Sequence, residues 1–260
     1  MIFADAPLAR RVEGAEAAIA RGTSGQPGTA VLDLDGGCAI FSGAESPLTQ
    51  AVGVGLNGTV TEAKVVEIER FFRQRGARPR FEVCPMADPD FIAILGDRGY
   101  RPAEFNNVLV KQLAGTEIAL TPRARRAIAD EADLWSHTVG CGFFEHAELT
   151  DDEMEIGRAI ARMPGAVCFL AATETGQIAA AAAMAAHGGL ATLFADSTVA
   201  RFRGSGLQRE LIVARLNEAI ATGCDLATAS TLPGSGSQRN YERLGFQVVY
   251  TRVTMCGDKK

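Results

Sequence analysis

A short glycine-rich loop holds the residue types in this sequence that best fit binding chemistry. The loop reads Arg203-Gly204-Ser205-Gly206 and leads directly into a long helical pattern. The first N–H groups of a helix have no partner within the helix and lie at the positive end of its dipole, so glycines there let an anion approach bare amides. The loop therefore predicts a phosphate site. The alternative is a tight turn whose glycines only permit positive φ.

The same loop differs from two common nucleotide-binding motifs. It lacks the Lys-Ser/Thr pair of a P-loop and the complete G-x-G-x-x-G of a dinucleotide fold. Nucleoside triphosphates and NAD are therefore poor candidates for the ligand.

The elements that must position this loop follow from the apolar pattern around it. We expect a strand over 191–199 before the loop and a helix over 207–221 after it. Ala179 begins a run of five alanines, which favours helix, but glycines at 176, 188 and 189 bracket a segment of strand length. The pattern therefore predicts the following further elements: helices over 130–139 and 151–161, a hairpin with arms 167–173 and 178–186, a strand over 226–230, a short helix and a last strand.

The chain also repeats itself. A helix, a glycine, an aromatic residue and a strand follow one another at Gly99 and again at Gly245, 146 residues later, and the helix-ending Gly76 and Gly223 lie 147 apart. Two copies of one α/β unit explain this, with domains 1–115 and 116–260 and a fresh strand at 117–120. The alternative is that the two stretches resemble each other by chance, because a helix followed by a glycine and a strand is a common pattern.

The loop and a downstream motif together resemble a known family. Arg203-Gly204-Ser205-Gly206, followed by Tyr241-Glu242-Arg243-Leu244-Gly245-Phe246, is similar to the GCN5-related N-acetyltransferases, and the resemblance covers 167–253. It implies an α/β (mixed α+β) fold of two tandem units, each a mixed, mostly antiparallel sheet flanked by helices. It also implies acetyl-coenzyme A as cosubstrate, with the pyrophosphate at the glycine loop and no metal.

The resemblance assigns cofactor contacts residue by residue. The backbone N–H groups of 198–200 would polarise the thioester carbonyl, and Gln208 stands where the family has a small residue. The family's Asn in the last helix has no counterpart here, and Ser237 and Asn240 are the substitutes. The cofactor residues expected are Thr198, Val199, Ala200, Arg203, Gly204, Ser205, Gly206, Leu207, Gln208, Ser237 and Asn240.

Acyl transfer to an amine needs a base for the amine and an acid for the departing thiolate. Tyr241 matches the family tyrosine assigned as general acid, and a phenol suits that role. Tyr241 could instead be a core residue of an amphipathic helix. The base candidates are Asp196, Glu145 and His146, each of which could equally be a solvated surface group.

The first copy lacks the features that would bind a phosphate. The offset of 146 places Asn57, Gly58, Thr59 and Val60 opposite the loop, so the cation is lost and a β-branched residue stands where a backbone must approach a phosphate. Thr59 and Glu62 have the spacing of a capping box. The first unit is therefore predicted to be a degenerate copy without a cofactor.

Composition excludes several classes of protein. The net charge of −5 and a pI near 5.4 argue against a nucleic-acid partner. We find no signal peptide and no apolar run long enough for a membrane span, so a cytoplasmic protein is expected. The six cysteines form no C-x-x-C pair and the three histidines no metal motif, which predicts reduced thiols and no metal site.

The sequence thus supports an N-acetyltransferase that acts on a primary amine of a small molecule or a protein. The alternative from a different class is a noncatalytic acyl-coenzyme A binding module with a regulatory or sensor role. A homodimer is left open.

Overall fold

Two compact units make up the chain. The computed structural model describes residues 2–113 and 119–257. Unit 1 runs to Val108 and takes in Thr231–Pro233 and the chain from Val248 on, whereas unit 2 comprises Leu109–Ser230 and Gly234–Gln247. The sequence-based boundary after residue 115 left the last strand in the C-terminal domain. The structure groups that strand with unit 1 because it pairs there with β4 (Arg80–Val83).

Unit 1 is a mixed sheet covered by helices on both faces. Its sheet order is β1-β2-β3-β4-β11-β5, with β3 and β4 parallel and the pairs β1–β2, β2–β3 and β4–β11 antiparallel. The remaining elements are α1 (Ala6–Arg21), β1 (Ala30–Asp33), β2 (Cys38–Phe41), β3 (Gln50–Val52), α2 (Glu62–Arg73), α3 (Pro89–Asp97), the first part of β5 (Arg101–Gln112) and most of β11 (Gln247–Cys256).

The two faces of the unit 1 sheet bury alternate residues of the same strands. Ala39 and Ala51 belong to the core cluster that α2 completes, whereas Cys38 and Val52 pack against Ala17 of α1. Successive residues of a strand point to opposite faces, so short runs such as Cys38–Phe41 supply both cores. The helix that was expected to end near Gly76 is confirmed by α2, which ends at Arg73.

The strands of unit 2 have the order β5-β10-β9-β8-β7-β6. Strands β9 and β10 pair in parallel, and the pairs β6–β7, β7–β8 and β8–β9 are antiparallel. Its elements after β5 are β6 (Ala124–Arg126), α4 (Ala132–Phe143), α5 (Asp151–Ala161), β7 (Val167–Ala172), β8 (Ile178–His187), β9 (Leu190–Thr198), α6 (Leu207–Ala221), β10 (Leu226–Thr231) and α7 (Gly236–Arg243).

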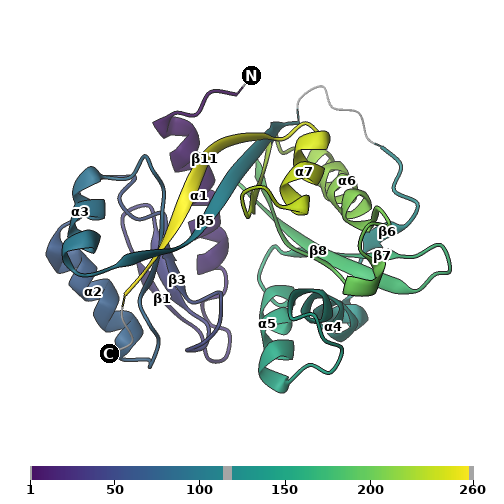
Figure 1. The fold of residues 1–260 in the computed structure, drawn as a ribbon, viewed down its shortest axis with the longest axis horizontal. Helices are drawn as coiled ribbons and strands as arrows, with labels where there is room; N and C mark the ends of the chain where they lie inside the picture. The colour runs from purple at the N-terminus through teal and green to yellow at the C-terminus, as the bar shows by residue number, and fades with distance from the viewer. Residues whose placement is uncertain (1, 114–118, 258–260) are drawn as a thin grey trace. The chain divides into compact units, whose positions relative to one another are not determined.

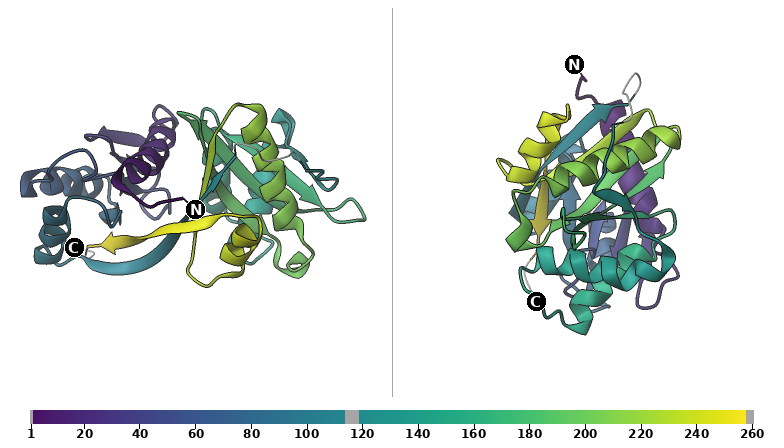
Figure 2. Two further views of the ribbon diagram at one scale, coloured as in Figure 1. Left: turned by 90° about the horizontal axis from the view of Figure 1, so that it is seen from above. Right: turned by 90° about the vertical axis from the view of Figure 1, so that its right-hand side faces the viewer.

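Helices lie on both faces of the unit 2 sheet. Figure 1 shows α4 and α5 on one face and α6 and α7 on the other, and both views of Figure 2 show α6 lying along its face of the sheet. The expected fold class, a mixed sheet flanked by helices in each unit, is confirmed. Helices α5 and α6 begin and end at the predicted residues.

Two expectations near the start of unit 2 differ from the structure. The fresh strand expected at 117–120 falls partly on residues 117 and 118, which lie outside the described residues, and 119–120 are not in a strand. The next strand along the chain is β6, which begins at Ala124. The helix expected over 130–139 begins at Ala132 and continues to Phe143. It runs on because Val139 and Cys141 are buried, as is Trp135 in the same helix.

Strand β8 shows why the alanine run is extended. Ala179, Ala180, Ala181, Ala182 and Ala183 are fully buried, since α4 packs on one face of the strand and α6 on the other. The indole of Trp135 donates to the carbonyl of Ala182 at 3.0 Å, and the guanidinium of Arg215 donates to the carbonyl of Ala183 at 3.1 Å. Short side chains let both large groups reach the backbone, so tertiary packing outweighs the helix propensity of alanine.

Candidate functional site

The loop before α6 has the conformation expected of an anion site. Gly204 and Gly206 have φ of 81° and 83°, and Gly206 is the N-cap of α6. Among the described residues, no side chain caps this helix, so its first amides remain available to a ligand. Glycine is favoured at 206 by this positive φ, whereas the nearest atom to an added Cβ, Nη2 of Arg123 at 3.3 Å, belongs to the end of a flexible side chain that can move.

A cavity of about 610 Å³ opens at this helix start, within the range usual for ligand pockets. We call it the α6 cavity. Of the residues expected from sequence, its wall includes Asp196, Thr198, Arg203, Gly204, Gly206, Leu207, Gln208, Ser237 and Asn240. The sequence reading missed Gly142, Ser197, Phe202, Gly236, Arg239 and Arg243, which also line it. Ser205 and Tyr241 are not among the lining residues.

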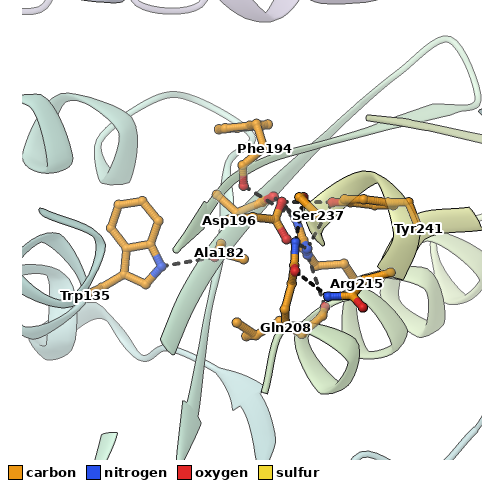
Figure 3. Close-up of polar contacts among 11 residues, drawn as sticks. Trp135, Ala182, Phe194, Asp196, Gln208, Arg215, Ser237 and Tyr241 are labelled. Atoms are coloured by element: carbon orange, nitrogen blue, oxygen red, sulfur yellow. Dashed lines mark hydrogen bonds and ion pairs between the residues drawn. The ribbon is translucent and has the colours of Figure 1, made fainter. Parts of the chain in front are cut away.

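Three of the expected cofactor residues join α6 to α7. The side-chain amide of Gln208 donates to Oγ of Ser237 at 2.7 Å, and Asn240 donates to the amide oxygen of Gln208 at 2.7 Å. The large side chain that departs from the family pattern is thus used to fix the two helices that border the cavity. Figure 3 shows Gln208 and Ser237 in this contact.

The expected phosphate cation, Arg203, already has partners. Its guanidinium donates to Glu145 at 2.7 Å, to the carbonyl of Gly142 at 2.9 Å and to the carbonyl of Thr198 at 3.3 Å. Both charged side chains are about half exposed, and such pairs are weak in water. A phosphate in the cavity would therefore compete with a carboxylate that is easily displaced.

Asp196, Arg215 and Tyr241 form a buried polar cluster behind the cavity wall (Figure 3). The hydroxyl of Tyr241 donates to Oδ2 of Asp196 at 2.8 Å, and Arg215 donates to the same oxygen at 2.9 Å and also to Oδ1. Arg215 and Tyr241 are essentially inaccessible to solvent, whereas Asp196 lines the cavity. The carboxylate is therefore held from behind and faces the ligand space.

A bulge in β9 aims Asp196 at this cluster. Ala195 has φ of 55°, and two residues of β9, Ala195 and Asp196, stand opposite the single Ala182 in the pairing with β8. The extra residue bends the strand and redirects the side chain that follows. Arg215 gave one signal in the sequence, because it is a charge within the apolar pattern of α6.

Burial also changes the acidity of the phenol. The pKa of Tyr241 lies well above its ordinary value because the ring is desolvated and its hydroxyl faces the Asp196 carboxylate, although Arg215 acts in the opposite direction. The phenol is therefore protonated, and its hydrogen is donated to the carboxylate of Asp196. The role of Tyr241 as the general acid stays a prediction. It requires the hydroxyl of Tyr241 to break its hydrogen bond to Asp196 before it can donate to a thiolate.

A neighbouring cavity of about 420 Å³ is lined by four more of the expected residues. Glu145, His146, Val199 and Ala200 line it. His146 is within 3.1 Å of Glu153, and the N–H of Val199 is donated to the carbonyl of Ala179 at 3.0 Å. The N–H of Val199 is thus used by the sheet. It is not available to polarise a thioester carbonyl, which is the role that the resemblance implied for it.

The start of α2 in unit 1 shows what replaced the phosphate site in the first copy. The N–H of Val60 donates to Oδ2 of Asp88 at 2.7 Å, so an internal carboxylate takes an amide at this helix start. The predicted capping box of Thr59 and Glu62 is wrong, because Thr61 is the N-cap and accepts from the N–H of Lys64. The helix begins one residue later than its counterpart in unit 2.

In residues 2–113 and 119–257, no group of three or more His, Cys, Asp or Glu side chains is arranged to hold a metal ion. No helix in that part of the chain has the length and apolar character needed to cross a membrane. All six cysteines are free in the structure.

Comparison with known proteins identifies the fold. No family model and no curated protein matches the chain. A GCN5-related N-acetyltransferase from Kribbella flavida is 18% identical over 96% of this chain and 95% of that one, with a TM-score of 0.70. A tandem GNAT protein from the clavulanic acid biosynthesis pathway is 15% identical over 100% and 97%, with a TM-score of 0.62. A GCN5-related N-acetyltransferase from Sphaerobacter thermophilus is 14% identical over 89% and 76%, with a TM-score of 0.59.

Proposed function

We propose that this chain, which has the fold of the tandem GCN5-related N-acetyltransferases, transfers an acetyl group from acetyl-coenzyme A to a primary amine of a small molecule or a protein. The observation that carries the proposal is the uncapped start of α6, where Gly204 and Gly206 open the first amides of a 15-residue helix onto the α6 cavity. A pyrophosphate is the anion that this arrangement suits.

Only unit 2 is proposed to bind the cofactor. In unit 1 the carboxylate of Asp88 accepts a hydrogen bond from the backbone N–H of Val60, and Val60 is itself buried. A phosphate there would have to displace a negative charge that belongs to the fold. Unit 1 is therefore proposed to be structural or to shape the acceptor site, with one cofactor bound per chain.

The reaction needs one proton removed and one delivered. The amine nitrogen attacks the thioester carbonyl carbon, the C–S bond breaks, and its electron pair leaves on sulfur. The amine then loses a proton and the thiolate gains one. Asp196 is the one carboxylate among the described residues that line the α6 cavity. We therefore propose that Asp196 is the base that accepts the amine proton, either directly or through water.

The remaining candidates have narrower roles. Tyr241 is proposed to return a proton to the thiolate, by releasing its hydrogen bond to Asp196. Glu145 lines the neighbouring cavity and binds Arg203, so its contribution as a base is proposed only for an acceptor that enters from that side.

Calorimetry followed by an activity screen tests the proposal. The full chain should bind coenzyme A with one site per chain, and acetyl-coenzyme A should release its thiol in the presence of one member of a panel of small amines and peptides. Binding without turnover would instead support the noncatalytic acyl-coenzyme A module. Absence of binding would contradict both.

A further inference from the structure

Three arginines line the wall of the α6 cavity, although the protein as a whole is acidic. The chain has a net charge of −5, yet three guanidinium groups line this cavity, those of Arg203, Arg239 and Arg243. The carboxylate that faces them, Asp196, is already bound by the buried Arg215. An anionic ligand is therefore favoured inside the cavity despite the acidic protein.

Two of these arginines have no polar partner among the residues that the structure describes. Within the part of the chain that the structure describes, neither Arg239 nor Arg243 makes a side-chain hydrogen bond or an ion pair, and both are exposed. Several other arginines of unit 2 are paired with carboxylates, as Arg123 is with Glu210 and Arg158 with Asp133. The two free cations thus lie together at the cavity.

Helix α7 presents both side chains on one face. Arg239 and Arg243 are four residues apart, the spacing that places helical side chains next to each other. The same helix carries Ser237 and Asn240, which bind Gln208 in the first turn of α6. The paired cations therefore lie on a helix that is fixed directly to the proposed pyrophosphate site.

Building on the proposed function, we propose that Arg239 and Arg243 form a second phosphate subsite, which binds the ribose 3′-phosphate of coenzyme A. Coenzyme A carries phosphate at two places, a pyrophosphate and a 3′-phosphate, separated by one ribose. With the pyrophosphate at Gly206, the helix amides supply the first set of contacts, and the α7 arginines supply charge-assisted contacts to the second. The protein then selects coenzyme A over 3′-dephospho-coenzyme A.

Titration calorimetry with these two ligands tests the subsite in the full chain. The parent protein should bind coenzyme A about ten- to a hundredfold more tightly than the dephospho form, as expected for contacts to a charged group. The double variant Arg239→Ala/Arg243→Ala should bind coenzyme A as weakly as the dephospho form, and its affinity for the dephospho form should equal that of the parent. The double variant Arg239→Lys/Arg243→Lys should keep part of the selectivity, because charge remains but bidentate geometry is lost.

Arg209→Ala is the matched control, because Arg209 is exposed in the first turn of α6 but does not line the cavity. It should leave the selectivity unchanged, and unfolding curves should show that all variants fold. Equal affinity of the parent for both ligands would overturn the subsite and leave the proposed function standing. Equal weakening of both ligands in the alanine double variant would also overturn it, by assigning the arginines to the pyrophosphate. If neither ligand binds the parent protein, the proposed function fails and the subsite fails with it.

Discussion

The hydroxyl of Tyr241 lies 2.8 Å from Oδ2 of Asp196, and the phenol is the donor. Arg215 reaches the same carboxylate from α6, so a phenol and a guanidinium, both buried, hold one carboxylate at the cavity wall. Any proton that Asp196 accepts from a substrate arrives at a group with two internal donors. The acid–base behaviour of the site therefore belongs to this cluster and not to a single side chain.

The Tyr241→Phe variant separates proton delivery from packing. The ring should keep its edge-to-face contact with Phe246, at a centroid distance of 4.9 Å, so affinity for coenzyme A should not change. Turnover should fall by roughly 10²- to 10⁴-fold, the range for a positioned general acid. Steady-state kinetics with an active amine measures this. Turnover at the parent rate would reduce Tyr241 to a core residue that supports Asp196.

Gly206→Val copies the residue of the first unit and should abolish coenzyme A binding. A β-branched side chain is strained at φ of 83° and closes the approach to the α6 amides. Gly223→Val is the control, because Gly223 follows the other end of α6 with φ of 79° in open space. It should lose similar stability and still bind. Calorimetry that detects binding to the Gly206 variant would remove the helix start from the cofactor site.

Arg203→Ala should weaken coenzyme A binding by roughly 1 to 3 kcal/mol, with less effect at high salt, if the guanidinium leaves Glu145 for a phosphate. An affinity that does not change would assign Arg203 to the surface ion pair alone.

Glu145→Gln provides the opposite test of the same ion pair. Removing the competing carboxylate should tighten coenzyme A binding about two- to fivefold, since exposed pairs are worth about 0.2–1 kcal/mol. Glu148→Gln makes the same charge change at an exposed residue nearby and should have no effect. Titrations of both variants at low salt decide the point, and equal responses would show that only net charge matters.

Glu13 predicts a pH dependence of stability in unit 1. It is fully buried, accepts from the hydroxyl of Tyr250 at 2.7 Å and pairs with Arg252, which also binds Glu16. Burial raises the pKa of Glu13 from 4.5 to about 7, with Arg252 opposing the shift and Glu16 adding to it. The folded state thus holds this proton longer than the unfolded state. The stabilising contribution is complete below pH 4.5 and is lost as pH rises through 7.

Urea unfolding at pH 5 and pH 8 measures this effect against Glu13→Gln, which keeps the shape and cannot ionise. The parent should lose free energy of unfolding relative to the variant as the pH rises. Asp35→Asn, at an exposed carboxylate of the same unit, should follow the parent. Parallel pH profiles of the parent and Glu13→Gln would contradict the raised pKa.

The sequence predicted best those elements whose pattern and boundaries are local. Helix α6 lies between Gly206 and Gly223, and its bounds were predicted correctly. Strand β8 lies between Gly176 and Gly188, so it was predicted as a strand despite its alanine run. Three features depend on contacts between distant residues and could not be predicted in this way. These are the bulge at Ala195, the carboxylate of Asp88 at the start of α2, and the assignment of β11 to unit 1.

The all-alanine stretch of β8 also bears on the entropy of folding. Alanine has no side-chain rotamers to lose, so ordering Ala179 through Ala183 costs only backbone entropy, whereas longer apolar residues would lose rotamer freedom as well. The strand carries the carbonyls that fix Trp135 and Arg215, two of the largest buried side chains of the protein. These five residues of β8 therefore supply two backbone acceptors for large buried side chains without any loss of rotamer freedom of their own.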